Sequence, residues 1–249
     1  MEIQLQNLTK KFPNRNRKHP GDVIAVNEFN FTMPDGQLIG LLGPSGCGKS
    51  TTLNLICGLE KPTSGKIFFG SEDVTGVEPE HRGVGMVFQN YALYPHLTVR
   101  KNIMFPLENL KGKDRLSKEE MEKRVLDAAK MVSLEELLDR KPRELSGGQP
   151  QRLALARTLA HPRPLMILDD PFSALDRKTE DAVFANLQAY AKDKVVFLIS
   201  HRLYHFPQMQ QVIFMEDGKT TVGTHDELMA SVPTYRWLYE NQTRGEAHA

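Results

Sequence analysis

The chain has 249 residues, of which 40% are hydrophobic and 25% charged, and its formal net charge is +1. This length and composition fit one large α/β domain, and a charge so near zero argues against a general nucleic-acid binder, which carries a strong basic excess. The two cysteines, Cys47 and Cys57, form no disulfide or metal-binding pattern, so we expect a reducing compartment.

The N-terminal part of the chain predicts strands at residues 2–7, 22–32 and 37–42. The first begins with the alternating residues Met1 to Leu5 and lacks the continuous apolar core of a signal peptide. The sequence contains no stretch close to the roughly 20 apolar residues that a transmembrane helix needs. Any membrane attachment is therefore expected to be peripheral, with the pore in a separate polypeptide.

Residues 43–50 have the pattern G-x-x-x-x-G-K-S of a phosphate-binding loop. In such a loop the backbone N–H groups surround phosphate oxygens, the lysine reaches the terminal phosphates and the serine hydroxyl faces Mg²⁺. The helix that follows points its positive N-terminus at the same phosphates. The predicted nucleotide-binding residues here are Gly43, Pro44, Ser45, Gly46, Cys47, Gly48, Lys49, Ser50 and Thr51.

The rest of the chain alternates between helical and strand patterns. Ser117 and Glu120 have the spacing of a capping box, and the apolar residues from Met121 to Val132 recur at helical spacing. Strands are predicted at residues 165–169, 195–200 and 211–216, and the apolar, proline-bounded run at 165–168 indicates a buried parallel strand. Asp217-Gly218 predicts a hairpin turn, followed by a last strand and short helices.

The segment Leu145-Ser146-Gly147-Gly148-Gln149 resembles the signature of ATP-binding cassette (ABC) proteins. Further segments match that family's motifs in the same order along almost the whole chain. The resemblance implies an α/β P-loop NTPase of the ABC type, with a RecA-like core sheet, an antiparallel β subdomain and a helical subdomain inserted at residues 90–160. We expect a single domain at residues 1–249 without the C-terminal regulatory domain of many importers.

The resemblance also implies roles for residues outside the phosphate loop. Phe12 would stack on adenine, although a core position on an edge strand is the alternative because buried aromatic residues are common. Gln89 would complete the shell of a Mg²⁺ ion that Ser50 and Asp169 also hold. His201 would contact the γ-phosphate. The signature would act on the nucleotide of a second subunit, and Asp176 would lie in a loop that reaches the opposite site.

Two positions depart from the family pattern. Asp170 stands where the family has a glutamate that polarises the attacking water, and its side chain is one methylene shorter. We therefore expect slow hydrolysis. If Ser146 caps the signature helix, Pro150 occupies the fourth helical position and removes a backbone hydrogen bond. The alternative is that the first turn absorbs this change.

The two ends of the chain resemble different branches of the family. Residues 87–99 and 139–142 resemble ATPases of binding-protein-dependent importers, whereas residues 173–180, 200–203 and 223–228 resemble exporter cassettes. We expect an ATP-hydrolysing subunit at the cytoplasmic face of the membrane that pairs with a second cassette, as a homodimer or heterodimer, and with transmembrane permease subunits. Uptake, with a solute-binding protein as a further partner, is the first interpretation. An exporter cassette and a weakly hydrolysing regulatory subunit are the alternatives.

Overall fold

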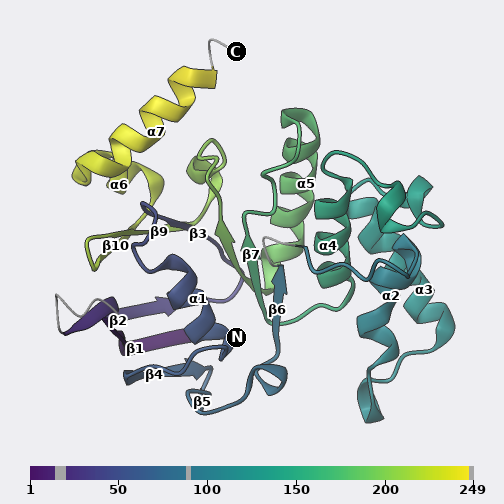
Figure 1. Cartoon of the computed structure of the whole chain (residues 1–249), viewed down its shortest axis with the longest axis horizontal. Helices are drawn as coiled ribbons and strands as arrows, with labels where there is room; N and C mark the ends of the chain where they lie inside the picture. The colour runs from purple at the N-terminus through teal and green to yellow at the C-terminus, as the bar shows by residue number, and fades with distance from the viewer. Residues whose placement is uncertain (15–20, 88–90, 247–249) are drawn as a thin grey trace.

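Two sheets and several helices make up the part of the chain that the computed structural model describes, residues 1–14, 21–87 and 91–246 (Figure 1). The first sheet is antiparallel and has the strand order β2-β1-β4-β5. Its strands are β1 (Ile3–Pro13), β2 (Asp22–Met33), β4 (Ser64–Phe69) and β5 (Glu72–Asp73). The first strand thus continues beyond the predicted residue 7, to Pro13.

The second sheet has the order β10-β9-β3-β8-β7-β6. Its strands are β3 (Leu38–Leu42), β6 (Val84–Val87), β7 (Leu165–Asp169), β8 (Val195–Ile199), β9 (Gln211–Glu216) and β10 (Lys219–Gly223). All neighbouring pairs run parallel except β9 and β10. Because the carboxyl ends of parallel strands meet at one edge, the residues after β3, β7 and β8 come together there. The predicted fold class is confirmed.

The core sheet is covered on both faces, and β7 shows why. Leu165 and Ile167 belong to a buried cluster with helix α1 (Lys49–Cys57) and the antiparallel sheet. Met166 and Leu168 belong instead to the cluster formed with the remaining helices. Successive residues of a strand point to opposite faces, so each alternate pair of β7 joins a different core. A continuous apolar run is what such a doubly covered strand requires.

Helices from the middle of the chain form a group on one side of the molecule (Figure 1). They are α2 (Val99–Glu108), α3 (Lys118–Met131), α4 (Gln149–Ala160) and α5 (Arg177–Tyr190). At the start of α3, the Ser117 side chain accepts a hydrogen bond from the Glu120 N–H at 3.1 Å. The predicted capping box is wrong in its other half, because Glu120 pairs with Arg124 one turn later, at 3.2 Å. An i,i+4 ion pair of this kind competes for the same carboxylate.

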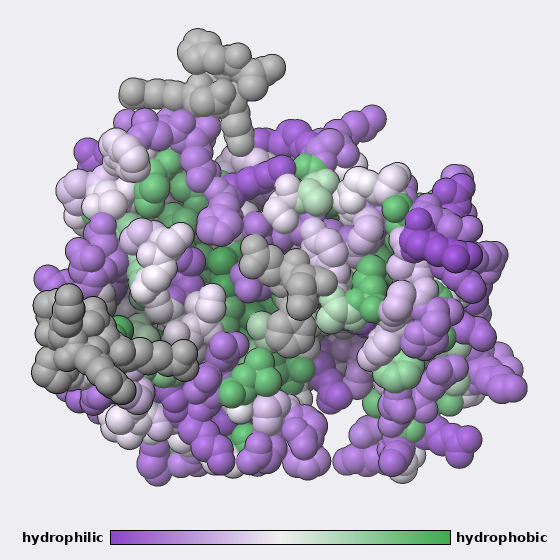
Figure 2. Space-filling model, in the orientation of Figure 1, coloured by the Kyte–Doolittle hydropathy of each residue, from purple (hydrophilic) through white to green (hydrophobic). Residues whose placement is uncertain are grey.

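The C-terminal part confirms the predicted hairpin. Asp217 and Gly218 both have positive φ, of 49° and 72°, as the two-residue turn between β9 and β10 requires. Helices α6 (His225–Ser231) and α7 (Pro233–Glu246) follow. Within the described residues, the helices are all too short or too polar to cross a membrane. Figure 2 shows hydrophilic residues over much of one face, with apolar ones gathered toward its middle.

Candidate nucleotide-binding site

The phosphate loop joins the end of β3 to α1. Lys49 Nζ donates to the backbone carbonyls of Gly43 at 2.6 Å and Pro44 at 2.9 Å. Gly48 has φ of 102°, and a Cβ atom there would lie 2.1 Å from the carbonyl oxygen of Ala25 on β2. Since glycine alone combines this conformation with so close an approach, the loop is held directly against β2 by backbone contact.

A pocket of about 150 Å³ lies over the phosphate loop between β2 and the turn after β9. Ser50 and Thr51 follow in the first turn of α1, whose N-terminus favours anions. The lining residues are Ile24, Ala25, Pro44, Ser45, Gly46, Cys47, Asp217 and Gly218.

Two carboxylates stand at the end of β7. Asp169 is half-buried, and burial raises its pKa. The Asp170 carboxylate raises that pKa further, whereas His201 and Lys49 lower it. These charges all act on Asp169, which therefore lies near the phosphate-loop lysine, Asp170 and His201. His201 reaches this site from the end of β8, with its side chain exposed.

Asp170 is held by its backbone rather than by its carboxylate. Its N–H donates to the Ile199 carbonyl at 2.9 Å, and its φ of 48° lies in the left-handed region. The side chain is 6% exposed, yet Oδ1 has no hydrogen-bond partner within the described part of the chain. Strained backbone and an unpaired buried oxygen both raise the free energy and are found together at reactive sites. This geometry suits a carboxylate that acts on a bound water.

Ser50 and Asp169 offer a hydroxyl and a carboxylate oxygen, which are donors that suit Mg²⁺. Among the residues that the structure describes, no three or more His, Cys, Asp and Glu side chains gather into a metal site. A Mg²⁺ ion here would therefore also need water and phosphate oxygens, which is its usual manner of binding. Gln89, the third predicted ligand, lies outside the described residues.

The signature residues form a turn that leads into α4. Leu145 follows a 3₁₀ turn at Pro142–Glu144, and Gly147 has φ of 53°. A Cβ atom on Gly148 would lie 2.4 Å from Leu175 Cδ2 and 2.6 Å from the Ala174 carbonyl oxygen. Glycine at this position therefore lets the signature turn pack directly against the loop at residues 173–176.

The prediction that Ser146 caps the signature helix is wrong. Gly148 is the N-cap of α4, so Pro150 occupies the second helical position. The N–H at this position has no partner within any α-helix, and proline is well tolerated there. The cost of about 3 kcal/mol for a proline deeper in a helix does not arise. The Ser146 N–H instead donates to the Gln149 side chain at 3.0 Å.

Asp176 caps helix α5. Its carboxylate accepts from the Thr179 N–H at 3.0 Å and from the Thr179 hydroxyl at 2.7 Å. These hydrogen bonds lower the pKa of Asp176. The Asp176 side chain is exposed, and its lowered pKa keeps the carboxylate ionised at neutral pH.

Phe12 lies on β1 and is half-buried rather than part of either core. It pairs across the sheet with Val23 of β2, and Lys10 Nζ lies 4.8 Å from its ring centre. Val23 and Ile24 are 51% and 47% exposed, and Ile24 also lines the pocket over the phosphate loop. Of these two exposed residues, Ile24 is the one that lines the pocket, whereas Phe12 pairs with its neighbour Val23.

A model of the family described as "ABC transporter" matches residues 26–173. The chain belongs to the ABC transporter family. A xylose/arabinose import ATP-binding protein of Haloferax volcanii is 40% identical over 221 residues, which are 88% of this chain and 55% of the relative. A sulfate/thiosulfate import ATP-binding protein of Shewanella oneidensis is 41% identical over 255 residues, which are 100% of this chain and 65% of the relative. The ABC chain described here thus spans between half and two thirds of the length of these relatives.

Solved structures agree with this assignment. The dimeric structure of a bacterial ABC transporter cassette matches with a TM-score of 0.78 and 32% identity, over 89% of this chain and 98% of that chain. This similarity covers nearly all of that cassette, and the residues matched by the family model, 26–173, include both the phosphate loop and the signature turn.

One residue of the ABC cassette that the sequence analysis missed is Gln151, two positions after the signature. Its Nε2 donates to the Asp170 carbonyl at 2.7 Å and to Ser173 Oγ at 2.9 Å. Its Oε1 accepts from the Ala174 N–H at 2.9 Å. Gln151 is 1% exposed. The one feature of the sequence that could have indicated its role was a polar residue at a buried position of a helix. Its amide ties the signature helix of the ABC fold to the residues around Asp170.

A second missed residue is Arg202, directly after His201. Its guanidinium donates to the carbonyls of Leu175 at 2.7 Å and Ser173 at 3.0 Å, and to Glu180 Oε2 at 2.6 Å. Burial raises the pKa of Glu180, against the opposing effect of the hydrogen bond from Arg202. A fully buried carboxylate thus anchors the arginine that holds the loop of the ABC cassette at residues 173–176.

Proposed function

We propose that this chain is the ATP-binding and ATP-hydrolysing subunit of an ABC importer, located peripherally at the cytoplasmic face of a membrane. The observation that carries this proposal is that one chain holds two halves of an ATP site. One half is the phosphate loop with Asp169, Asp170 and His201, and the other is the exposed signature turn. Two cassettes would each supply the half that the other lacks. The relatives described above are import ATP-binding proteins, which supports this interpretation.

In the proposed site, each residue acts through the atoms already described. The loop N–H groups and Lys49 bind the β- and γ-phosphates. Ser50 and Asp169 hold Mg²⁺, which neutralises charge on the phosphates when it is bound. The Asp170 carboxylate orients the attacking water and accepts its proton, and His201 contacts the γ-phosphate. The signature turn of the second cassette closes the site, which explains why ATP would bring the two cassettes together.

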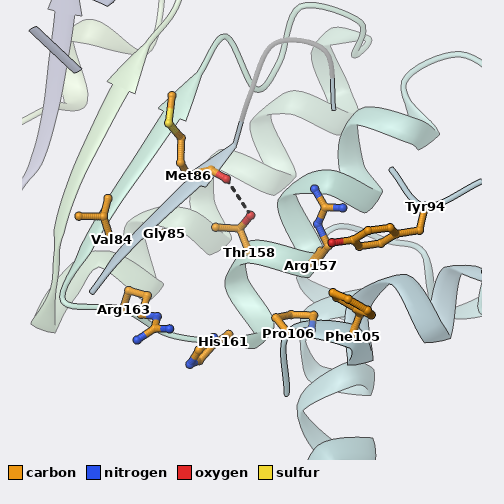
Figure 3. Close-up of a pocket in the computed structure, with 10 residues that line it drawn as sticks. All are labelled: Val84, Gly85, Met86, Tyr94, Phe105, Pro106, Arg157, Thr158, His161 and Arg163. Atoms are coloured by element: carbon orange, nitrogen blue, oxygen red, sulfur yellow. Dashed lines mark hydrogen bonds between the residues drawn. The ribbon is translucent and has the colours of Figure 1, made fainter. Parts of the chain in front are cut away.

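A second pocket, whose lining contains no phosphate-loop residue, supports the proposal of a permease partner. It has a volume of about 310 Å³ and lies between β6, the edge strand of the core sheet, and helices α2 and α4 (Figure 3). Its lining combines apolar side chains with cations, a combination that fits a short amphipathic helix. The lining residues are Val84, Gly85, Met86, Tyr94, Phe105, Pro106, Arg157, Thr158, His161 and Arg163.

The charge of this pocket favours a partner with a carboxylate. Burial and, to a lesser extent, the neighbouring Arg163 lower the pKa of His161 to about 4, so this imidazole is neutral at pH 7. The positive charge comes from Arg157 and Arg163. Arg157 already donates to the carbonyls of Ala92 at 2.6 Å and Tyr91 at 3.0 Å. Arg163 is therefore the cation that we assign to an acidic residue of the permease helix.

We assign recognition of the solute to the membrane and solute-binding subunits. Relatives named for sugars and for sulfate have nearly the same identity to this chain, 40% and 41%. If the cassette contacted the solute, we would expect relatives with different solutes to differ more in their identity to this chain. A second candidate function, a regulatory subunit with weak hydrolysis, is favoured by Asp170. Pro150 adds no support for this candidate, because proline fits its position in α4.

Deletion of the gene for this chain is expected to abolish the uptake of one solute by the cell. Pentoses and sulfate, measured as radiolabelled solutes, are the first to try. The parent chain should restore uptake, whereas Arg163→Glu should not, because it places a negative charge against the permease carboxylate. Lys130→Glu, an exposed charge reversal on α3, is the control and should restore uptake. Loss of efflux in place of uptake would favour the exporter alternative.

Phe12→Ala is expected to weaken ATP binding by about 1–3 kcal/mol, the range found for stacking of a base on an aromatic side chain. Phe12→Tyr and Phe12→Trp should restore the affinity, because both keep an aromatic ring on which a base can stack. Titration of the purified variants with a fluorescent ATP analogue measures this. If all three bind like the parent, adenine is held elsewhere.

A further inference from the structure

Helix α7 contacts the backbone of the segment that carries His201. Gln242 Nε2 donates to the His201 carbonyl at 2.6 Å, and Gln242 Oε1 accepts from the Leu203 N–H at 3.1 Å. One side-chain amide therefore bonds to the backbone on both sides of Arg202. We call residues 200–203 the switch segment.

The inner face of α7 determines where Gln242 lies. Tyr235, Tyr239 and Gln242 are four and three residues apart, so they share one side of the helix. Tyr235 is completely buried, and its hydroxyl lies 2.7 Å from His225 Nδ1. The Tyr239 ring lies 4.5 Å from that of His225. Aromatic contacts at the start and middle of α7 thus fix the helix before it reaches the switch segment.

The switch segment is held from its other side as well. Arg202 donates to the carbonyls of Ser173 and Leu175, so its side chain points toward the loop before α5 while Gln242 holds the adjacent backbone. The His201 side chain is exposed, and its position depends on this backbone. A shift of the backbone by about 1 Å is enough to cost on the order of 10²-fold in rate at a reacting group.

We propose that Gln242 is a positioning residue for His201, through which helix α7 regulates ATP hydrolysis. The amide fixes the switch segment so that the imidazole can meet the γ-phosphate. Anything that moves α7 away from the core removes both hydrogen bonds together. This inference rests on the role proposed above for His201.

The test compares Gln242→Met, which keeps the side-chain length without either hydrogen bond, with Asn241→Met on the exposed face of α7. The single-turnover rate of Mg-ATP hydrolysis by the purified chain is expected to fall about tenfold in Gln242→Met, within the range for a misplaced group, while the affinity for ATP, measured separately by titration, stays unchanged. Asn241→Met should match the parent. Gln242→Ala tests the same bonds if methionine disturbs the packing.

A double variant shows whether Gln242 acts through His201. In the His201→Ala background, Gln242→Met should slow hydrolysis no further. Hydrogen exchange gives a reading independent of activity: the Leu203 amide should exchange faster in Gln242→Met and not in Asn241→Met. A parental rate in Gln242→Met, or an equal slowing in both backgrounds, overturns the inference and leaves the proposed function intact. If His201→Ala itself hydrolyses ATP like the parent, the role of His201 and this inference are both wrong.

Discussion

Lys49→Ala is expected to abolish ATP-dependent pairing of two cassettes and ATP hydrolysis while leaving the fold intact. The lysine ammonium is the point charge of the phosphate loop, held by the carbonyls of Gly43 and Pro44. A cation in this place makes charge-assisted bonds to phosphate oxygens. Its side chain is half-buried and belongs to neither hydrophobic core, so the substitution creates no core cavity.

Sedimentation of the purified chain with and without Mg-ATP measures the pairing, and thermal unfolding checks the fold. Lys130→Ala, an exposed substitution on α3, should pair and hydrolyse like the parent. A Lys49→Ala chain with parental nucleotide affinity and turnover would contradict the assignment of the loop as the phosphate site.

Asp170→Glu is expected to raise the single-turnover rate of ATP hydrolysis by as much as about 10²-fold without a change in ATP affinity. The aspartate carboxylate is withdrawn by about one C–C bond from the place that a glutamate would reach, and a misplacement of about 1 Å has an effect of this order. Oδ1 of Asp170 is buried and unpaired among the described residues, so the longer side chain would extend toward the nucleotide without breaking an existing hydrogen bond of that atom.

Two further substitutions decide between a slow site and an inactive one. In a slow site, Asp170→Asn and His201→Ala both reduce the remaining rate. In an inactive site, Asp170→Asn changes nothing, and turnover stops only when the corresponding carboxylate of a partner cassette is removed. Fast hydrolysis by the parent chain, unchanged by Asp170→Glu, would refute the slow-site interpretation and favour a symmetric, fully active homodimer.

The features that the sequence predicted well are those determined locally. The phosphate loop follows from glycines and a lysine at fixed spacing, and the β9–β10 turn follows from two adjacent residues that accept positive φ. The buried strand β7 follows from a short apolar run bounded by prolines, whereas the arrangement of the core sheet was implied by the resemblance to ABC proteins. In each case, neighbouring residues alone determine the backbone conformation.

The features that the sequence could not provide depend on contacts between distant segments. Gln151 meets Ser173 across 22 residues, and Gln242 meets His201 across 41. Neither spacing has a sequence pattern. The sequence left the effect of Pro150 open for a different reason: the N-cap of α4 is Gly148, two residues later than Ser146, and the capping preference of serine does not indicate this.

The contact between Gly148 and the loop at residues 173–176 has a genetic consequence. The side-chain amide of Gln151, on the signature helix, braces both this loop and Asp170. It accepts from the Ala174 N–H and donates to the Asp170 carbonyl. If two copies pair as proposed, a substitution that loosens this brace damages the chain's own water-activating carboxylate and, in the same molecule, the cap over its neighbour's nucleotide. A defective copy would therefore impair the intact copy with which it pairs. In a cell that makes both, such an allele should be dominant over the normal one, whereas an allele that prevents pairing should be recessive.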